Sequence, residues 1–480
     1  RYSRAGWGRR GAYGAPPLGK APTTRLGRAM TEAAPRPAET FAEAEDALLS
    51  RWPETKLEPT LDRIRAFTEL LGDPQKTYPV VHLTGTNGKT STSRMIDTLL
   101  RALDLRTGRF TSPHLERMSE RICVDGAPLT DEEFVRAFND MAPYTHLVDS
   151  TQEFPLSFFE TVVGMAYAAF ADAPVDIAVV EVGMGGAWDA TNVADGSVAV
   201  VLPISVDHEK YLGGDPVEIA VEKSGIIKPG AIAVLAEQTP AVAEVLLRRA
   251  AEVGAEVVRE GVEFGVLHRA AAVGGQVATI QGLRATYDEV FLPLYGAHQA
   301  QNAAVALAAV EAFVGTDPLD DEVVRAAFAE VSSPGRLEVV RRSPTIILDA
   351  AHNPHGAEAT AAALEDSFSF EPLVGVMGVM ADKDYEGVLA AFEPHLAHLV
   401  CTQNTSFRSM TAERLAHAAR EVFGEDRVSV RPLLADAIDE ATAIAERGEG
   451  RGSSLGSGAV LVTGSVVTVG EARAMLRRRS

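Results

Sequence analysis

Cysteine is scarce in this chain of 480 residues, which holds only Cys123 and Cys401. Two thiols so far apart in sequence exclude a cysteine-based zinc cluster and favour a reducing compartment, so we expect both to be packing residues. The sequence also lacks any run of about 18 apolar residues, which excludes a membrane-spanning helix. Basic residues are in the minority, 45 Lys and Arg against 66 Asp and Glu, and the net charge of -21 disfavours nucleic acid and anionic lipid as partners. These absences predict a cytoplasmic protein without nucleic acid or membrane partners.

Acidic residues are missing from the first 31 residues, which carry seven basic residues and many glycines and prolines. We expect residues 1–38 to form a disordered basic tail, either translated upstream sequence or an added segment. An organelle transit peptide is the alternative.

The segment Gly85-Thr86-Asn87-Gly88-Lys89-Thr90-Ser91 lies between an apolar run at 78–83 and a helical pattern at 93–103. This order predicts a strand, a glycine turn and a helix. Such a turn directs backbone N–H groups and the positive end of the helix dipole at one point, and Lys89 adds an ammonium for the outer phosphates. The spacing is shorter than that of the general phosphate-binding loop, because Leu83 stands where that motif has glycine. We therefore expect a nucleoside triphosphate site, with an ordinary strand-to-helix turn as the alternative.

After the tail, short apolar segments alternate with amphipathic or alanine-rich ones, the pattern of a mostly parallel α/β sheet covered on both faces. The expected strands are residues 80–83, 177–182, 198–204 and 232–235, followed by 345–349, 374–379, 399–402 and 460–463. Residues 332–336, Ser-Ser-Pro-Gly-Arg, are expected to be a linker. The chain is thus predicted to have an ATP-binding domain over residues 39–331 and a smaller Rossmann-like domain over residues 337–480. The Gly/Ser-rich residues 448–458 are expected to form a mobile surface loop.

A carboxylate and an imidazole follow two of the expected strands. Glu181 lies at the end of one strand, before the glycine-rich residues 182–186, and Asp207-His208 follow another. The carboxyl ends of parallel strands are where open α/β sheets hold ligands, and these groups can bind Mg²⁺. A single histidine at a strand end is more often structural, but its combination with the phosphate loop favours a metal role.

Asp215-Pro216 begins a further predicted helix, which carries Lys223 and is expected to end at Pro229-Gly230. A lysine directed from it toward a metal centre would be desolvated, and an uncharged amine can react with CO₂ to form a carbamate. A solvated surface lysine is the alternative.

Several separated motifs occur together over about residues 41–475. They are Gly85 to Lys89, Thr111-Ser112-Pro113-His114-Leu115, Glu181 to Gly186, Asp189-Ala190-Thr191-Asn192, Asp207-His208, Glu222 to Lys228, Gly296-Ala297-His298-Gln299, Asn302 and Asp349 to Pro354. Together these motifs resemble the folylpolyglutamate synthase/dihydrofolate synthase family of Mur-like ligases.

The resemblance implies that ATP phosphorylates a carboxylate of dihydropteroate or of a reduced folate, after which the amine of L-glutamate attacks the acyl phosphate. It implies catalytic roles for Lys89, His208, Lys223 and Arg336. It also implies two Mg²⁺ ions, held by Thr90, Ser112, Glu181, His208 and a carbamate of Lys223, and allows K⁺ as a further ion. Relatives often have glycine after the loop lysine, so whether Thr90 or the next residue, Ser91, contacts Mg²⁺ stays open. A monomer is expected.

Three substrate sites follow from the same resemblance. The ATP site would comprise Gly85, Thr86, Asn87, Gly88, Lys89, Thr90, Ser91, Asn302, Arg336, Asp349 and His352. The folate site would comprise Leu57, Glu58, Pro59, Ser112, Pro113, His114, Ser157, Phe158, Phe159, Glu160, Trp188, Asp189 and Ala190. His352 and Ser465 are the candidates for glutamate.

Two other functions are compatible with the phosphate loop. A peptidoglycan Mur ligase would need a UDP-binding domain before the loop, but only 84 residues precede Gly85. A nucleotide-gated switch would leave Lys223 and the second-domain motifs without a purpose. The sequence leaves open whether both acceptors are used, how many glutamates are added, and whether the linkage is α or γ.

Overall fold

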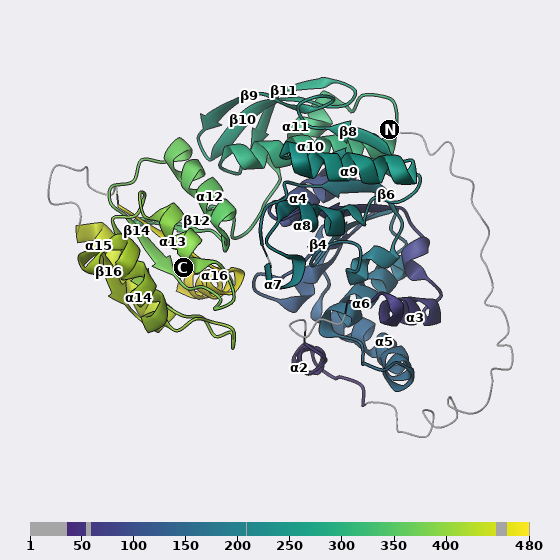
Figure 1. Ribbon diagram of the computed structural model, residues 1–480, viewed down its shortest axis with the longest axis horizontal. Coiled ribbons are helices and arrows are strands. Elements are labelled where there is room, and N and C mark those ends of the chain that lie inside the picture. Colours follow the sequence, from purple (N-terminus) through teal and green to yellow (C-terminus); the bar gives the residue numbers. More distant parts are fainter. Residues whose placement is uncertain (1–35, 54–58, 208, 448–457, 480) are drawn as a thin grey trace.

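The computed structural model describes residues 36–53, 59–207, 209–447 and 458–479, and it contains two sheet domains and a smaller three-stranded sheet (Figure 1). The first domain contains an eight-stranded sheet in the order β4-β3-β2-β5-β1-β6-β7-β8. Its strands are β1 Val80–Thr84, β2 Thr107–Phe110, β3 Ile122–Val124, β4 Ala127–Pro128, β5 Ile177–Glu181, β6 Gly196–Val201, β7 Ile232–Leu235 and β8 Glu256–Arg259. The pairs from β2 to β8 are parallel, whereas β3 and β4 form an antiparallel edge.

Helices cover both faces of this sheet. They are α2 Phe41–Leu49, α3 Asp62–Leu70, α4 Lys89–Ala102, α5 Asp131–Thr151, α6 Phe158–Asp172, α7 Glu209–Leu212, α8 Pro216–Ser224, α9 Pro240–Val253, α10 Ala297–Val314 and α11 Asp321–Ala329, with 3₁₀ turns η1 Pro74–Lys76, η2 Met118–Arg121 and η3 Ala190–Val193. Val81 and Leu83 pack with α4 and α10, whereas Val80 packs with α3, α5 and α6 on the opposite face. The central strand β1 is buried throughout, as expected for a parallel strand between two helical layers.

The small sheet was not among the predicted elements. It consists of antiparallel strands β9 Gly265–Ala272, β10 Gly275–Gln281 and β11 Thr286–Leu292, and it lies over α10 and α11 (Figure 1). Only part of it is buried, so its sequence mixes apolar and polar residues instead of forming the apolar runs by which the parallel strands were recognised.

The second domain contains a six-stranded sheet in the order β12-β13-β17-β14-β15-β16. Its strands are β12 Glu338–Arg342, β13 Thr345–Leu348, β14 Leu373–Met377, β15 His398–Cys401, β16 Val428–Val430 and β17 Ala459–Thr463; only the β12–β13 pair is antiparallel. The helices are α12 Pro354–Ser367, α13 Tyr385–Phe392, α14 Ala412–Phe423, α15 Leu434–Arg447 and α16 Val466–Arg479, with a 3₁₀ turn η4 Glu425–Arg427. Helices α12 to α14 pack on one face of the sheet, and α15 and α16 pack on the other. The mixed α/β architecture with a large, mostly parallel sheet is confirmed.

Several expected strands end one or two residues earlier in the structure, and two elements end at least three residues earlier. Strand β6 ends at Val201 instead of residue 204, and the chain then turns toward the phosphate loop. Helix α8 begins after the Asp215 cap, as predicted, but it ends at Ser224. The reason is Gly225, whose N–H caps the last turn and whose carbonyl accepts a hydrogen bond from Asn192 at 3.2 Å.

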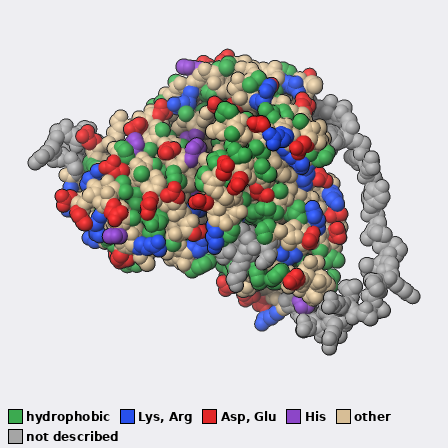
Figure 2. All heavy atoms as spheres, viewed as in Figure 1, with side chains coloured by type: hydrophobic (Ala, Val, Ile, Leu, Met, Phe, Trp, Pro, Cys, Tyr) green, Lys and Arg blue, Asp and Glu red, His purple; other side chains and the backbone are tan. Residues whose placement is uncertain are grey.

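Residues 36–38 have no regular secondary structure, and most of the predicted tail and of the Gly/Ser-rich loop lies outside the described residues. Within the described ranges, no helix is both long and apolar enough to cross a bilayer. Figure 2 shows acidic and basic side chains interspersed over one face of the molecule. Cys123 and Cys401 are both buried, in accord with packing roles.

Candidate active site

The phosphate loop joins β1 to α4 and has no room for side chains at its two glycines. Gly85 has φ +148° and a Cβ there would lie 2.6 Å from Leu202 Cβ on the adjacent strand segment. Gly88 has φ +86° and faces Asn302 of α10, whose Oδ1 would lie 2.7 Å from an added Cβ. Asn302 is therefore in contact with the loop, and its nucleotide contact stays a prediction.

Hydrogen bonds hold the loop in shape. The Thr86 N–H donates to Pro203 O at 3.0 Å, and its hydroxyl donates to Ser205 O at 2.8 Å. Lys89 Nζ donates to Gly85 O at 2.9 Å and to Thr86 O at 3.1 Å. The ammonium is thus held over the loop itself, and burial lowers its pKa.

Thr90 and Ser91 point to different partners. Thr90 Oγ1 donates to the Glu181 carboxylate at 3.0 and 3.1 Å, whereas Ser91 Oγ is 2.9 Å from Ser333 Oγ in the linker. Glu181 is only 1% exposed, and burial raises its pKa to about 7. The geometry therefore favours Thr90 as the hydroxyl that shares an ion with Glu181, and Ser91 as a contact between loop and linker.

Lys223 lies beside the phosphate loop and not on the solvent face of α8. Its Nζ donates to Gly85 O at 3.0 Å, and the side chain is buried. Burial, followed by the charge of Lys89, lowers the pKa of Lys223 to about 7. A buried amine that readily loses its proton meets the chemical requirement for carbamate formation.

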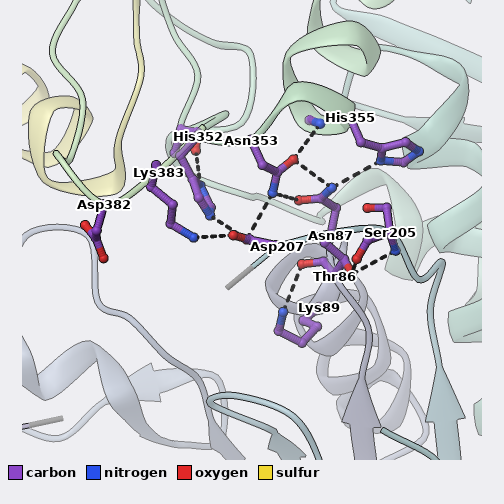
Figure 3. A network of polar contacts seen from close by, with 12 residues as sticks. Thr86, Asn87, Lys89, Ser205, Asp207, His352, Asn353, His355, Asp382 and Lys383 are labelled. Atoms are coloured by element: carbon purple, nitrogen blue, oxygen red, sulfur yellow. Dashed lines mark hydrogen bonds and ion pairs between the residues drawn. The ribbon is translucent and has the colours of Figure 1, made fainter. Parts of the chain in front are cut away.

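A polar network connects the phosphate loop to the second domain (Figure 3). Asp207 Oδ1 pairs with Lys383 Nζ at 2.5 Å, and Asp207 Oδ2 accepts from Asn353 Nδ2 at 3.2 Å. The Asn353 amide also exchanges hydrogen bonds with the Asn87 amide at 3.0 and 3.2 Å. His352 Nε2 lies 3.6 Å from Asp207 Oδ2. His208, the predicted metal ligand next to Asp207, lies outside the described residues.

A cavity of about 310 Å³ opens beside this network, between the two domains. The first domain contributes Pro53, Pro59, Thr60, Arg63, Ser112, Pro113, Arg121, Ser157, Phe159, Glu160, Gly183, Met184, Trp188, Asp189, Ala190 and Tyr211. The second domain contributes His352, Met380, Lys383, Arg408, Ser465, Val466 and Val467. The wall thus combines aromatic and aliphatic side chains with several cations.

Most of the described residues predicted for folate line this cavity, but two do not. Phe158 packs into the core of the first domain, with the Arg121 guanidinium 4.9 Å from its ring centre, while Phe159 faces the cavity. His114 Nδ1 accepts from Arg121 Nε at 3.0 Å, and burial lowers the pKa of His114 to about 3. His114 therefore orients Arg121, which does reach the cavity. Leu57 and Glu58 lie outside the described residues.

Two further residues predicted for the ATP site, Arg336 of the linker and Asp349 after β13, differ in their surroundings. The charge of Arg336 contributes to lowering the pKa of both Lys89 and Glu181, with burial the larger effect on each, so the guanidinium lies within electrostatic range of the phosphate loop. Asp349 is buried, and its carboxylate accepts from the Leu337 and Ala351 N–H groups at 2.9 and 3.0 Å. Asp349 thus joins the linker to the end of β13, and its ribose contact stays a prediction.

Sequence reasoning missed several side chains at the site. Lys383 and Arg408 bring positive charge from the second domain, and Arg63 is held in the cavity wall by Glu160 at 3.1 Å. None lies in a motif that predicts a ligand on its own. Lys383 belongs to the loop after β14 and Arg408 to the loop after β15, so their position at strand ends was the available signal.

No group of three or more His, Cys, Asp or Glu side chains in the described ranges is placed to hold a metal ion. The oxygen donors that do converge are the Glu181 carboxylate and the Thr90 hydroxyl. A single buried carboxylate with a hydroxyl suits Mg²⁺, which commonly binds one or two carboxylates together with nucleotide phosphates.

Two family models match the chain: the Mur ligase middle domain over residues 149–310, and the Mur ligase glutamate ligase domain over residues 335–466. The dihydrofolate synthase/folylpolyglutamate synthase of Mycobacterium tuberculosis is 49% identical over 456 residues, which are 91% of this chain and 94% of that protein. The protein of the same name from Bacillus subtilis is 31% identical over 431 residues, 88% of this chain and 96% of its own.

Solved structures agree with these relatives. The Mycobacterium tuberculosis folylpolyglutamate synthase complexed with ADP has a TM-score of 0.88 at 50% identity, covering 91% of this chain and 98% of that one. Escherichia coli FolC in complex with DHPP and ADP has a TM-score of 0.80 at 30% identity, covering 93% of this chain and 100% of that one. With a phosphate loop, a two-domain cavity and relatives that match over nearly their whole length, the chain belongs to the dihydrofolate synthase/folylpolyglutamate synthase family of Mur-type ligases.

Proposed function

We propose that the chain is an ATP-dependent ligase that adds L-glutamate to reduced folates and to dihydropteroate through an acyl phosphate. The observation that carries this proposal is the cavity between the domains, because one wall of it contains Lys383, whose ammonium is bound to Asp207 in the network that reaches the phosphate loop. A ligand in the cavity would therefore have one end close to bound ATP.

The cavity wall suits a flat acceptor that ends in a carboxylate. Phe159, Trp188 and Met184 offer apolar and aromatic surface to a ring system. Arg121 and Lys383 also line the cavity and can pair with carboxylates. The names of the relatives and the folate-bound complex of a related synthase, whose structure has a TM-score of 0.77 at 30% identity, support a folate as that acceptor.

The phosphate loop would bind the ATP phosphates through its backbone N–H groups and Lys89. Arg336 would add a second positive charge for the phosphates, since its charge helps to lower the pKa of Glu181 against the larger effect of burial. Because Arg336 is the last residue of the predicted linker, its distance from the phosphates depends on how the second domain sits on the first. Asn302, packed against Gly88, would contact the nucleoside.

Thr90 and Glu181 are the residues that would hold a Mg²⁺ ion, with Ser112 completing the set as the cavity-lining hydroxyl. When bound, Mg²⁺ would neutralise the charge of the transferring phosphoryl group. A second Mg²⁺ held by His208 and Lys223 is part of the same proposal.

Lys223 would hold that second ion as a carbamate. The uncharged amine attacks CO₂, a C–N bond forms, one C=O electron pair moves to oxygen, and the amine releases a proton. The product is an anion close to the Lys89 ammonium, whose charge already acts on Lys223. The pKa of about 7 keeps a large part of the amine uncharged near neutral pH.

In the reaction, the acceptor carboxylate oxygen attacks the γ-phosphorus while the bond to the ADP oxygen breaks. The glutamate amine then attacks the acyl carbon, phosphate leaves, and the amine loses a proton to give the amide. The residues of this chain position the reactants and exclude water, because the second domain closes the cavity on the side of His352 and Ser465. Those two residues, with Arg408, are the proposed glutamate site.

Further parts of the proposal rest on family resemblance. They are activity on both acceptors, K⁺ as an additional ion and a monomeric enzyme. A cytoplasmic location is proposed from the composition of the sequence.

The decisive experiment measures ADP release by the purified chain with Mg-ATP and L-glutamate. Dihydropteroate, tetrahydrofolate and no acceptor are compared, and product masses are read in parallel. Acceptor-dependent turnover with a mass gain of one glutamyl unit is expected for both acceptors. Turnover with only one would restrict the function to that acceptor, and none with either would reject the ligase proposal.

A further inference from the structure

The loop after β2 contacts the second domain at a place separate from the nucleotide site. Ser112 and Pro113 line the cavity, and the next residues of the loop, Leu115 and Glu116, meet helix α16. Helix α16 lies on the side of the second domain that faces the first (Figure 1). Its first residues, Val466 and Val467, line the same cavity.

The loop and helix α16 pack closely against each other. Leu115 belongs to the first domain but packs against the apolar cluster between the second sheet and α15 and α16. A Cβ atom at Gly470 would overlap the Leu115 carbonyl oxygen, and one at Gly335 would lie 3.2 Å from Leu115 Cδ2. The loop backbone therefore lies directly on α16, and a glycine is needed there.

An ion triad lies beside this contact. The Arg473 guanidinium of α16 pairs with Glu116 through Nη1, and its Nε donates to Glu338 at 2.8 and 3.0 Å. Glu338 also accepts the Gly335 N–H at 2.8 Å. The Arg473 side chain is 11% exposed, so water screens the triad only partly. The Arg473 guanidinium thus links the loop after β2 in the first domain to the start of β12, the strand that follows the linker.

Movement of Glu116 would be transmitted to the cavity wall. The Glu120 carboxylate accepts the N–H groups of Leu115, Glu116 and Arg117 at 2.9, 3.1 and 2.9 Å. These bonds hold residues 115–117 in one turn on Glu120, and only His114 separates that turn from Ser112 and Pro113 in the cavity wall. In α16, the cavity residues and Arg473 lie about two turns apart on one rigid helix.

We propose that Leu115, Glu116, Gly470 and Arg473 form an interdomain clamp that positions the Ser112–Pro113 wall of the cavity against the start of α16 and so sets acceptor binding. The clamp rests on the proposed function for its effect on the acceptor, but its structural effect is measurable without turnover. Glu116 and Arg473 are positioning residues, since both act through the loop and the helix.

The test uses Glu116→Gln, which keeps the shape of the side chain and removes its charge. The KM for tetrahydrofolate is expected to rise about tenfold with kcat changed less than about threefold, because coupling contacts of this kind contribute a modest free energy. Glu116→Asp keeps the charge and should fall between wild type and Glu116→Gln. Arg477→Gln is the matched control, since Arg477 is 63% exposed and 3.7 Å from Glu116, and it should leave KM unchanged.

Gly470→Ala tests the shape contact independently of charge and should raise the same KM. Hydrogen exchange of residues 111–117 should be faster in both variants than in wild type, whether or not folate is a substrate. Wild-type KM and wild-type exchange in Glu116→Gln would overturn the clamp, even if Gly470→Ala failed to fold. Inactive wild-type protein with faster exchange in the variants would instead reject the proposed function and retain the clamp.

Discussion

At the residue scale, the site depends on two buried groups of opposite charge. Burial moves the pKa of Glu181 up to about 7 and that of Lys223 down to about 7. Both groups are therefore closer to neutral in the fold than in water. Bound nucleotide phosphates would favour the charged form of Lys223, and a bound cation would favour the charged form of Glu181. We therefore expect the charges of both groups to depend on bound ligands.

Lys223→Ala should abolish acceptor-dependent ADP release, with a loss of about 100-fold or more, because the proposed second ion would lose its ligand. The variant should stay folded, with an apparent Tm near that of wild type. A carbamate ¹³C signal should form from ¹³C-bicarbonate in wild type and be missing in the variant. Lys76→Ala is the control, since the Lys76 side chain is 55% exposed. Full activity of Lys223→Ala would contradict the carbamate.

We expect His82 to make the stability of the fold sensitive to acid. Burial lowers its pKa to about 3, and its Nε2 lies 2.9 Å from Thr191 Oγ1. The unfolded chain binds a proton near the ordinary value of 6.5 whereas the folded chain does not, so this stability is full above 6.5 and is lost as pH falls toward 3. Below about pH 6, one such histidine costs about 1.4 kcal/mol per pH unit.

The measurement is the apparent Tm at several pH values. His82→Gln should show a shallower fall of Tm with acidification than wild type. His417→Gln, whose side chain is 83% exposed, should retain the wild-type slope. Equal slopes in all three proteins would contradict the role of His82.

Residue identities in the site were only partly predictable. The sequence pointed to Phe158 and Phe159 together, but only Phe159 lines the cavity. It left Thr90 and Ser91 as alternatives, and their separation came from the helix, since adjacent residues on a helix face different directions.

At the element scale, the glycine-rich loop after β5 sets the position of α8. Cβ atoms at Gly186 would lie 2.8 Å from the carbonyl oxygens of both Glu222 and Lys223. The Glu222 carboxylate in turn accepts the N–H groups of Gly186 and Trp188 at 3.3 and 3.1 Å. This loop thus joins a cavity aromatic to the helix that carries Lys223.

Gly186→Ala should push α8 away from the loop and displace Lys223. We expect about tenfold or more loss of kcat/KM, with destabilisation of about 1–3 kcal/mol from the overlap. Gly265→Ala is the control, because the nearest atom to its Cβ, Gly261 N, lies 3.5 Å away. Activity and Tm are measured for both. Wild-type behaviour of Gly186→Ala would show that the loop yields without moving the helix.

Elements were predictable where burial is complete on both faces. The parallel strands appear as apolar runs, and the predicted β1, β7 and β17 agree with the structure within a few residues. The antiparallel strands β9 to β11 were missed because one face meets solvent and their apolar content is low.

At the scale of the whole molecule, the partly buried Asp207–Lys383 pair joins the two domains. The side chains are 9% and 11% exposed. Lys383→Met would leave this carboxylate without its cation, and the loss should lie below the about 3–5 kcal/mol typical of a fully buried pair, because some water reaches it. The apparent Tm should fall, and Asp207→Asn combined with Lys383→Met should recover part of the loss.

The test measures the apparent Tm of Lys383→Met, of Asp207→Asn and of the double variant. Additive losses would mean that the pair contributes no coupling between the domains. Arg269→Met is a useful comparison, because Arg269 pairs with Asp366 at 2.7 Å at another, more exposed contact between the small sheet and α12. Its effect should be the smaller one.

The sequence by itself determined the parallel α/β character, the phosphate loop and the order of the ligase motifs, because these depend on local spacing and on complete burial. The predicted domain limits at residues 331 and 337 stay a prediction. Only the tertiary structure decided which side chains of the two domains share a cavity, since Lys383 and Arg408 lie far in sequence from Ser112 and Trp188. It also decided that Lys223 is buried. The pKa of this amine, and therefore its charge, depends on the groups that fold around it, which local sequence does not reveal.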